Sequence, residues 1–114
     1  MKLNHLNLAV DDVGGAKAFL IRYFGLKDIS GGDTNKNRAF LQDDNGMVVS
    51  MFKGKDIVYP GTFHIGFIQP SEAAVDAMYA RMTADGLKAD PPQRSHGWTF
   101  YVKAPGGFLV EVLA

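Results

Sequence analysis

The sequence predicts an α+β fold made of two tandem βαβββ units, each a strand, a helix and three further strands. Two observations predict it. The segment Gly25–Lys27 returns 61 residues later as Gly86–Lys88, and Gly46 returns as Gly107 at the same spacing. Apolar residues alternate with a period of two in short segments and recur at helical spacing between them. A fixed repeat within one chain indicates a duplicated supersecondary unit.

The first unit is predicted over residues 1–52. Leucine and valine alternate with other residues from Leu3 to Val10, which places His5 on the strand face opposite the apolar side chains. Asp11 or Asp12 is expected to cap a helix that Gly25 ends. The helix presents a stripe of apolar residues: Ala16, Phe19, Leu20, Tyr23 and Phe24. Three shorter strands are expected around residues 27–29, 38–41 and 47–52.

The second unit, residues 63–114, repeats this order. A strand is expected at residues 63–68, a helix capped by Ser71 and stopped by Gly86, and strands at residues 98–103 and 108–113. The helix stripe consists of Val75, Met78, Tyr79 and Met82. Residues 53–62 are rich in glycine, proline and charge and are predicted to be a linker. Because half of such a chain would bury too little surface alone, residues 1–114 are expected to form one domain.

Composition excludes several classes of function. The 12 basic and 12 acidic residues cancel, so no charge pattern indicates binding to nucleic acid or to an anionic membrane. The chain has no cysteine, so any metal must be held by nitrogen and oxygen ligands. No signal peptide or apolar run of membrane-spanning length is present, and a cytoplasmic protein is the simplest expectation.

Two of the three histidines, His5 and His64, start the first strand of each unit. Glu111 interrupts an otherwise apolar strand near the end of the second unit. If the strands alternate alike, these three side chains converge on the polar inner face of a curved sheet. Two imidazoles and one carboxylate form the facial triad, which leaves adjacent positions open for substrate. The triad suits Fe(II), Mn(II), Ni(II) or Zn(II).

Simpler interpretations of the same residues remain open. A strand histidine is more often a hydrogen-bonded, partly exposed residue than a metal ligand. Glu111 is also compatible with a solvated edge strand, where charge prevents association. The repeat-equivalent placement of His5 and His64 favours the metal site.

Several motifs resemble those of the vicinal oxygen chelate superfamily, which includes glyoxalase I, bleomycin-resistance proteins, fosfomycin-resistance enzymes and extradiol dioxygenases. The motifs are His-x-x-x-x-Val-x-Asp from His5, Tyr-Phe-Gly-Leu from Tyr23, Phe-His-Ile-Gly-Phe from Phe63 and Pro-Gly-Gly-Phe-Leu-Val-Glu from Pro105. The resemblance implies a cup-shaped mixed sheet and a divalent metal bound by the first and last strands of each unit. The implied ligand positions are His5, Ser50, His64 and Glu111.

Ser50 departs from that pattern. It takes the position where resemblance to glyoxalase I calls for a second carboxylate, and a neutral hydroxyl is a poor ligand. The remaining three residues resemble the ligands of extradiol dioxygenases and fosfomycin-resistance enzymes. The resemblance implies an enzyme that chelates vicinal oxygens of a small substrate, through lyase, isomerase or dioxygenase-like chemistry. The alternative is a non-catalytic, ligand-sequestering protein of the bleomycin-resistance type; either is expected to be a homodimer.

Three further residues are candidates for substrate contact or charge stabilisation. Thr99 and Tyr101 lie on one strand face, within a stretch that resembles Arg-Ser-x-Gly-x-Ser-Phe-Tyr of fosfomycin-resistance enzymes. Arg38 takes the repeat position of Thr99, as an anion-binding group or as a solvated cross-strand partner. His96 has no histidine at its repeat position and is expected in an exposed loop, with a role as general base the minority alternative.

Overall fold

The computed structural model describes all 114 residues and divides them into two compact units. Met1–Tyr59 and Pro105–Gly107 form the first unit, and Pro60–Ala104 and Phe108–Ala114 form the second. The first unit contains β1 (His5–Val10), α1 (Val13–Phe24), β2 (Lys27–Asp28), β3 (Arg38–Gln42) and β4 (Val48–Lys53). The second contains β5 (His64–Ile68), α2 (Glu72–Ala84), β6 (Gln93–Arg94), β7 (Trp98–Lys103) and β8 (Leu109–Leu113). The prediction of two tandem βαβββ units is confirmed.

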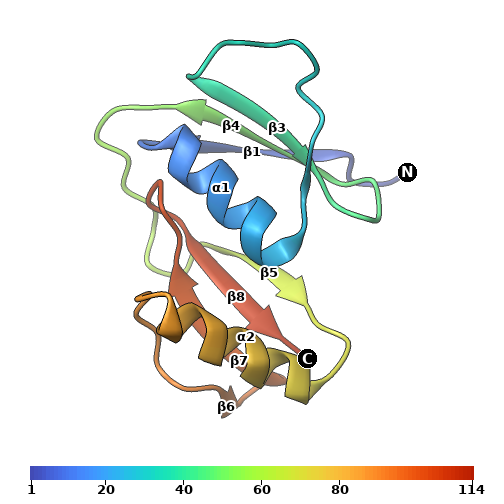
Figure 1. Cartoon of the computed structure of the whole chain (residues 1–114), viewed down its shortest axis with the longest axis vertical. Helices are drawn as coiled ribbons and strands as arrows, with labels where there is room; N and C mark the ends of the chain where they lie inside the picture. Colours follow the sequence, from blue (N-terminus) through green and yellow to red (C-terminus); the bar gives the residue numbers. More distant parts are fainter. The chain divides into compact units, whose positions relative to one another are not determined.

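The first unit has a four-stranded mixed sheet in the order β1-β4-β3-β2. Figure 1 labels β1, β4 and β3 of this sheet. β1 runs parallel to β4, and the other pairs are antiparallel. Helix α1 packs against β3 and β4, burying Phe19 and Leu20 with Leu8 and Val10 of β1 in the core. The strand alternation therefore leaves His5 exposed on the other face, as predicted.

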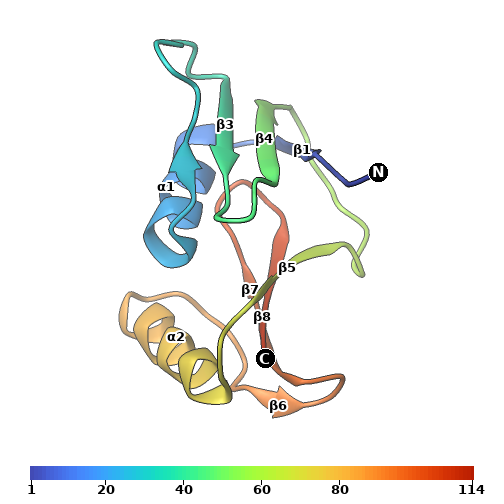
Figure 2. The same ribbon diagram turned by 90° about the vertical axis from the view of Figure 1, so that its right-hand side faces the viewer.

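The second unit repeats this topology with the order β5-β8-β7-β6. β5 is parallel to β8, and α2 packs against β7 and β8. In Figure 2 each helix lies on one side of the sheet of its own unit. Phe100, Val110 and Val112 are buried in the core of the second unit with Val75 and Met82 of α2. Each sheet thus has one face covered by its helix and one face that carries polar residues.

The helix ends follow the predicted caps. Asp12, rather than Asp11, accepts a hydrogen bond from the Gly15 amide, and Ser71 accepts one from Ala74. Such caps satisfy amides that have no partner within the helix. The C-cap of α1 is Gly25, as predicted, whereas the C-cap of α2 is Asp85, one residue before Gly86.

The predicted linker, residues 53–62, contains no strand beyond Lys53, the last residue of β4. Tyr59 holds it against β1, because the Tyr59 hydroxyl accepts a hydrogen bond from the Ala9 amide at 2.9 Å and donates one to the Ala9 carbonyl at 2.8 Å. The free edge of β1 is satisfied there by a side chain. Neither helix of the chain has the length and apolar character needed to cross a membrane.

Candidate functional site

Glu111 lies in the middle of β8 and is 4% exposed. The sheet register places Gly66 of β5 on one side of it and Tyr101 of β7 on the other. A Cβ atom added to Gly66 would lie 3.8 Å from Glu111 Oε2. The glycine therefore leaves the carboxylate the room beside β5 that a side chain would fill.

The two carboxylate oxygens of Glu111 have different partners. Oε1 accepts a hydrogen bond from Thr99 Oγ1 at 2.7 Å and lies 2.5 Å from His96 Nε2. Oε2 lies 3.2 Å from His64 Nε2. One oxygen is thus held by hydrogen-bond donors, and the other faces the histidine that starts β5.

This environment keeps Glu111 ionised. Burial by itself raises the pKa of Glu111, but hydrogen bonds from Thr99, His96 and Tyr101 outweigh burial and bring the pKa below its ordinary value. Burial and the hydrogen bond to Glu111 raise the pKa of Tyr101. Tyr101 therefore stays a neutral hydrogen-bond donor beside a charged acceptor.

His64 is oriented by the backbone. Its Nδ1 atom lies 3.0 Å from the Thr62 carbonyl oxygen, which can only accept a hydrogen bond, so Nδ1 carries a proton. Tyr101 packs edge-on against the ring, with the ring centroids 5.4 Å apart. With one proton fixed on Nδ1, Nε2 is the ring atom that can act as a metal ligand, and backbone anchoring of this kind is typical of metal-binding histidines.

In the first unit the equivalent face has neither a carboxylate nor a second histidine. Ser50 of β4 is buried and donates a hydrogen bond to Asn7 Oδ1 at 2.8 Å. His5 is exposed, with Nδ1 3.1 Å from Asn4 Oδ1. These residues border a cavity of about 470 Å³, whose remaining lining is apolar: Phe40, Val48 and Phe52. His5 therefore stands at the mouth of a largely apolar hollow.

The side chain of Arg38 is directed to a neighbouring loop. Its guanidinium binds Asp33, with Nε 2.7 Å from Oδ2. The pKa of Asp33 is lowered, first by the hydrogen bond from Arg38. The structure thus places Arg38 in an exposed ion pair with a residue of the loop before β3, and not with a charged partner on a neighbouring strand.

His96 belongs to the cluster although the sequence does not single it out for the site. It lies in the turn between β6 and β7, and its side chain is 53% exposed, as expected for a loop residue. Its ring nevertheless reaches the carboxylate of Glu111. The repeat does not mark His96 as a site residue, because the equivalent position in the first unit is Asn35 and not a histidine. His96 could have been recognised from its position two residues before β7, because β7 pairs with β8, the strand that carries Glu111.

A family model described as the Glyoxalase/Bleomycin resistance protein/Dioxygenase superfamily matches residues 2–112. The chain belongs to this superfamily. No curated protein matches the chain. Among solved structures, a possible glyoxalase from Bacillus cereus is 44% identical with a TM-score of 0.94, covering 100% of this chain and 99% of that one.

Two solved structures of fosfomycin resistance proteins are also similar to this chain. A mutant of FosX from Listeria monocytogenes, in complex with Mn(II) and 1S,2S-dihydroxypropylphosphonic acid, is 26% identical with a TM-score of 0.82, covering 99% of this chain and 91% of that one. FosX from Mesorhizobium loti, 21% identical with a TM-score of 0.79, covers 98% of this chain and 90% of that one and shows the shared fold alone.

Two donor atoms of the second unit, His64 Nε2 and Glu111 Oε2, are of the kinds that bind divalent metals. When the single ring proton of His64 is on Nδ1, both Nε2 and Oε2 of Glu111 carry lone pairs, and their 3.2 Å approach then calls for a cation between them. Nitrogen and oxygen donors of this type suit first-row divalent ions. No three histidine or acidic side chains of the structure are grouped as a metal ion would need.

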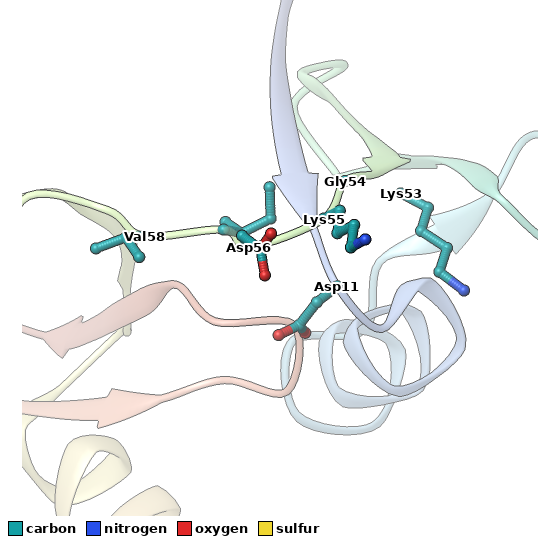
Figure 3. Close-up of a pocket in the computed structure, with 7 residues that line it drawn as sticks. Asp11, Lys53, Gly54, Lys55, Asp56 and Val58 are labelled. Atoms are coloured by element: carbon teal, nitrogen blue, oxygen red, sulfur yellow. The ribbon is translucent and has the colours of Figure 1, made fainter.

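A second hollow, of about 720 Å³, lies between the end of β1 and the segment that follows β4 (Figure 3). It is bordered by Asp11 and Asp56 together with Lys53 and Lys55. The two acidic and two basic side chains balance in charge, and no histidine borders the hollow. Its chemistry gives no reason to prefer it over the cluster around Glu111.

Proposed function

We propose that this protein is a metal-dependent enzyme that acts on a small molecule, with His5, His64 and Glu111 holding a divalent ion. The observation that carries the proposal is the pair formed by His64 Nε2 and Glu111 Oε2. Its donors are already oriented, His64 through the Thr62 carbonyl and Glu111 through Thr99. His5 supplies the third donor, and the two units act as one domain over residues 1–114.

Mn(II) is the first ion to test, because the similar FosX from Listeria monocytogenes was crystallised with it. Fe(II), Ni(II) and Zn(II) suit the same donors. A bound ion would supply Lewis-acid polarisation of two vicinal substrate oxygens. Isomerisation or lyase chemistry, ring cleavage with oxygen, and epoxide opening are all compatible with such chelation.

The protein's own residues would hold the substrate and stabilise charge. Tyr101 remains protonated beside Glu111, so its hydroxyl is a neutral donor at the site. Thr99 fixes the carboxylate. Arg38 would have to leave Asp33 before it could bind an anionic substrate. The cavity beside His5, with Phe40 and Phe52 in its lining, favours an apolar portion of the substrate there.

We further propose a homodimer, in which the units pair within one chain or across a two-fold axis. In the exchanged arrangement, His5 of one subunit serves His64 and Glu111 of the other. Mixing His5→Ala protein with Glu111→Gln protein distinguishes the two cases. Exchanged subunits regain Mn(II) binding in the mixed dimers, because one site of each mixed dimer is intact. Units that pair within one chain regain none.

The decisive experiment is elemental analysis of protein purified from cells supplied with Mn(II), Fe(II), Ni(II) and Zn(II). We expect about one first-row divalent ion per Glu111 site. His5→Ala, His64→Ala and Glu111→Gln should each lose the ion, whereas Lys103→Ala, on the exposed end of β7, should keep it. Wild-type protein without stoichiometric metal under all four supplies would rule out the proposal.

The second candidate is a ligand-sequestering protein of the bleomycin-resistance type. The neutral, partly aromatic cavity beside His5 favours it, because apolar ligands bind in such hollows without metal. The side chain of Trp98 is already engaged: Nε1 donates to Asp76, and the guanidinium of Arg94 lies over its ring. Phe40 and Tyr101 remain for that function. Absence of metal together with tight binding of an aromatic cation would favour this candidate.

A further inference from the structure

We propose that His96 is a positioning residue for Glu111: it holds Oε1 by a hydrogen bond so that Oε2 alone is presented to His64 and the metal. This inference rests on the proposed function and adds a residue to that site. His96 Nε2 lies 2.5 Å from Oε1. Because an ionised carboxylate can only accept, Nε2 must carry the proton.

Thr99 cannot hold Oε1 continuously by itself. Its hydroxyl has one proton and two acceptors within reach, Glu111 Oε1 at 2.7 Å and the Val112 carbonyl oxygen at 3.1 Å. Whenever Thr99 donates to Val112, it no longer donates to Oε1. His96 supplies a donor whose only partner in the structure is Oε1.

The loop that carries His96 is fixed at its base. The Ser95 amide donates to the Gly97 carbonyl at 2.9 Å, which closes the turn. Trp98 and Ala114 exchange two backbone hydrogen bonds, at 2.8 and 3.0 Å. A Cβ atom at Gly97 would lie 2.7 Å from the Ala114 carbonyl oxygen, closer than Cβ atoms approach other atoms in proteins. Gly97 therefore allows the turn to lie close enough for His96 to reach the carboxylate.

Whether Glu111 presents one oxygen or two decides how it can bind the metal ion. A carboxylate free to rotate can bind an ion through either oxygen or both, and each mode leaves a different number of positions for substrate. Residues that hydrogen-bond a ligand in this way usually change metal affinity by about 10- to 100-fold when they are removed. The ring of His96 is half exposed, so its removal should change the stability of the metal-free fold little.

The first test needs no metal. Long-range ¹H–¹⁵N NMR of the ring nitrogens in metal-free protein should show His96 protonated at Nε2 and its signal shifted in Glu111→Gln. A His96 ring protonated only at Nδ1, or a signal that Glu111→Gln leaves in place, would overturn the proposal. If this hydrogen bond is present and the wild type binds no ion, the proposed function fails while the link between His96 and Glu111 stands.

The second test measures Mn(II) affinity and the Mn(II) electron paramagnetic resonance spectrum. His96→Ala should weaken binding by about 10- to 100-fold and alter the spectrum, and His96→Gln, which retains a donor, should recover most of the affinity. Gly97→Ala should resemble His96→Ala although it keeps the imidazole. Arg94→Ala, at the end of β6 just before the turn, serves as the control. Wild-type affinity and spectrum in His96→Ala contradict the proposal, as does a loss as complete as that of His64→Ala, which would make His96 a ligand.

Discussion

The two units share one topology and differ at the residue that faces the open side of the sheet. In the second unit, Glu111 lies opposite Gly66, which leaves it space, and is surrounded by donors. In the first unit, the equivalent residue is Ser50, which lies opposite Asn7 and donates its hydroxyl proton to the Asn7 side chain. The strand positions are the same, but only one of them offers a charged group.

A buried charge at this position requires a whole set of neighbours. Thr99, His96 and Gly66 of the second unit correspond to Arg38, Asn35 and Asn7 of the first. Arg38 is paired with Asp33, and Asn35 takes part in the hydrogen bonds of its own loop. In the first unit Arg38 and Asn35 thus serve other partners, and the sheet carries a small neutral pair, Ser50 and Asn7, in place of a carboxylate.

The largest expected effect follows from placing a carboxylate in the first unit. Ser50→Glu should lower the free energy of unfolding by about 3 kcal/mol, because the buried charge would lack the donors that Thr99 and His96 supply to Glu111. Ser50→Ala, the control, loses only a hydrogen bond and should cost about 1 kcal/mol. Urea denaturation measures both.

Combination with Asn7→Gly sharpens that test. Asn7→Gly reproduces the space that Gly66 provides beside Glu111, so it should be at least about 1 kcal/mol less harmful in the Ser50→Glu background than alone. An additive result would mean that space beside β1 is unimportant. Wild-type stability of Ser50→Glu would contradict the comparison itself.

The turns that join the last two strands of each unit should differ in how much stability a Gly→Ala substitution costs. Gly106, before β8, has φ 97°, and an added Cβ would lie 3.0 Å from Val10 Cβ and 3.2 Å from Ala16 Cβ. Gly46, before β4, has φ 82° but open space around it. We expect Gly106→Ala to cost more than about 2 kcal/mol and Gly46→Ala about 1 kcal/mol. Equal losses by thermal unfolding would show that backbone strain alone matters.

A smaller effect is expected where an aromatic residue flanks the central strand. Tyr101 and Phe40 are paired with Glu111 and Ser50 in their sheets. Tyr101→Phe makes the second unit resemble the first and removes one hydrogen bond to Glu111, so it should cost about 1 kcal/mol in metal-free protein. Phe40→Tyr is the reciprocal control, because no carboxylate lies opposite it. Unchanged stability of Tyr101→Phe would show that its hydroxyl does not contribute.

The sequence predicts the elements well because they follow from local periodicity and caps. The alternation around His5 and the stop at Gly25 need no knowledge of distant residues. The pairing of His64 with Glu111 also follows, because the strand faces follow from the alternation. The short strand β6 has no repeat of apolar residues and is not assigned from the sequence.

The place of His96 could not be predicted, because it depends on contacts distant in sequence. The turn at residues 95–97 is placed by the pairing of Trp98 with Ala114 and by the absence of a side chain at Gly97. Arg38 shows the opposite case. Its strand position is predicted, but its direction depends on Asp33, five residues before it in a loop.

The smallest expected effect concerns the first turns of the two helices. Asp12 caps α1 so closely that a Cβ at Gly15 would clash with its carboxylate and would lie 3.1 Å from Pro105 Cβ. At the equivalent position of α2, Ser71 is followed by Ala74. Gly15→Ala therefore displaces the cap, which costs about 1 kcal/mol, while alanine gains about as much in helix propensity. We expect Gly15→Ala to be nearly neutral and Asp12→Ala to cost about 1 kcal/mol in the wild type but nearly nothing in Gly15→Ala. Ser71→Ala should cost about the same as Asp12→Ala. Additive losses in urea denaturation would show that the Asp12 cap persists beside an alanine, and the two glycines of α1 would then need another explanation.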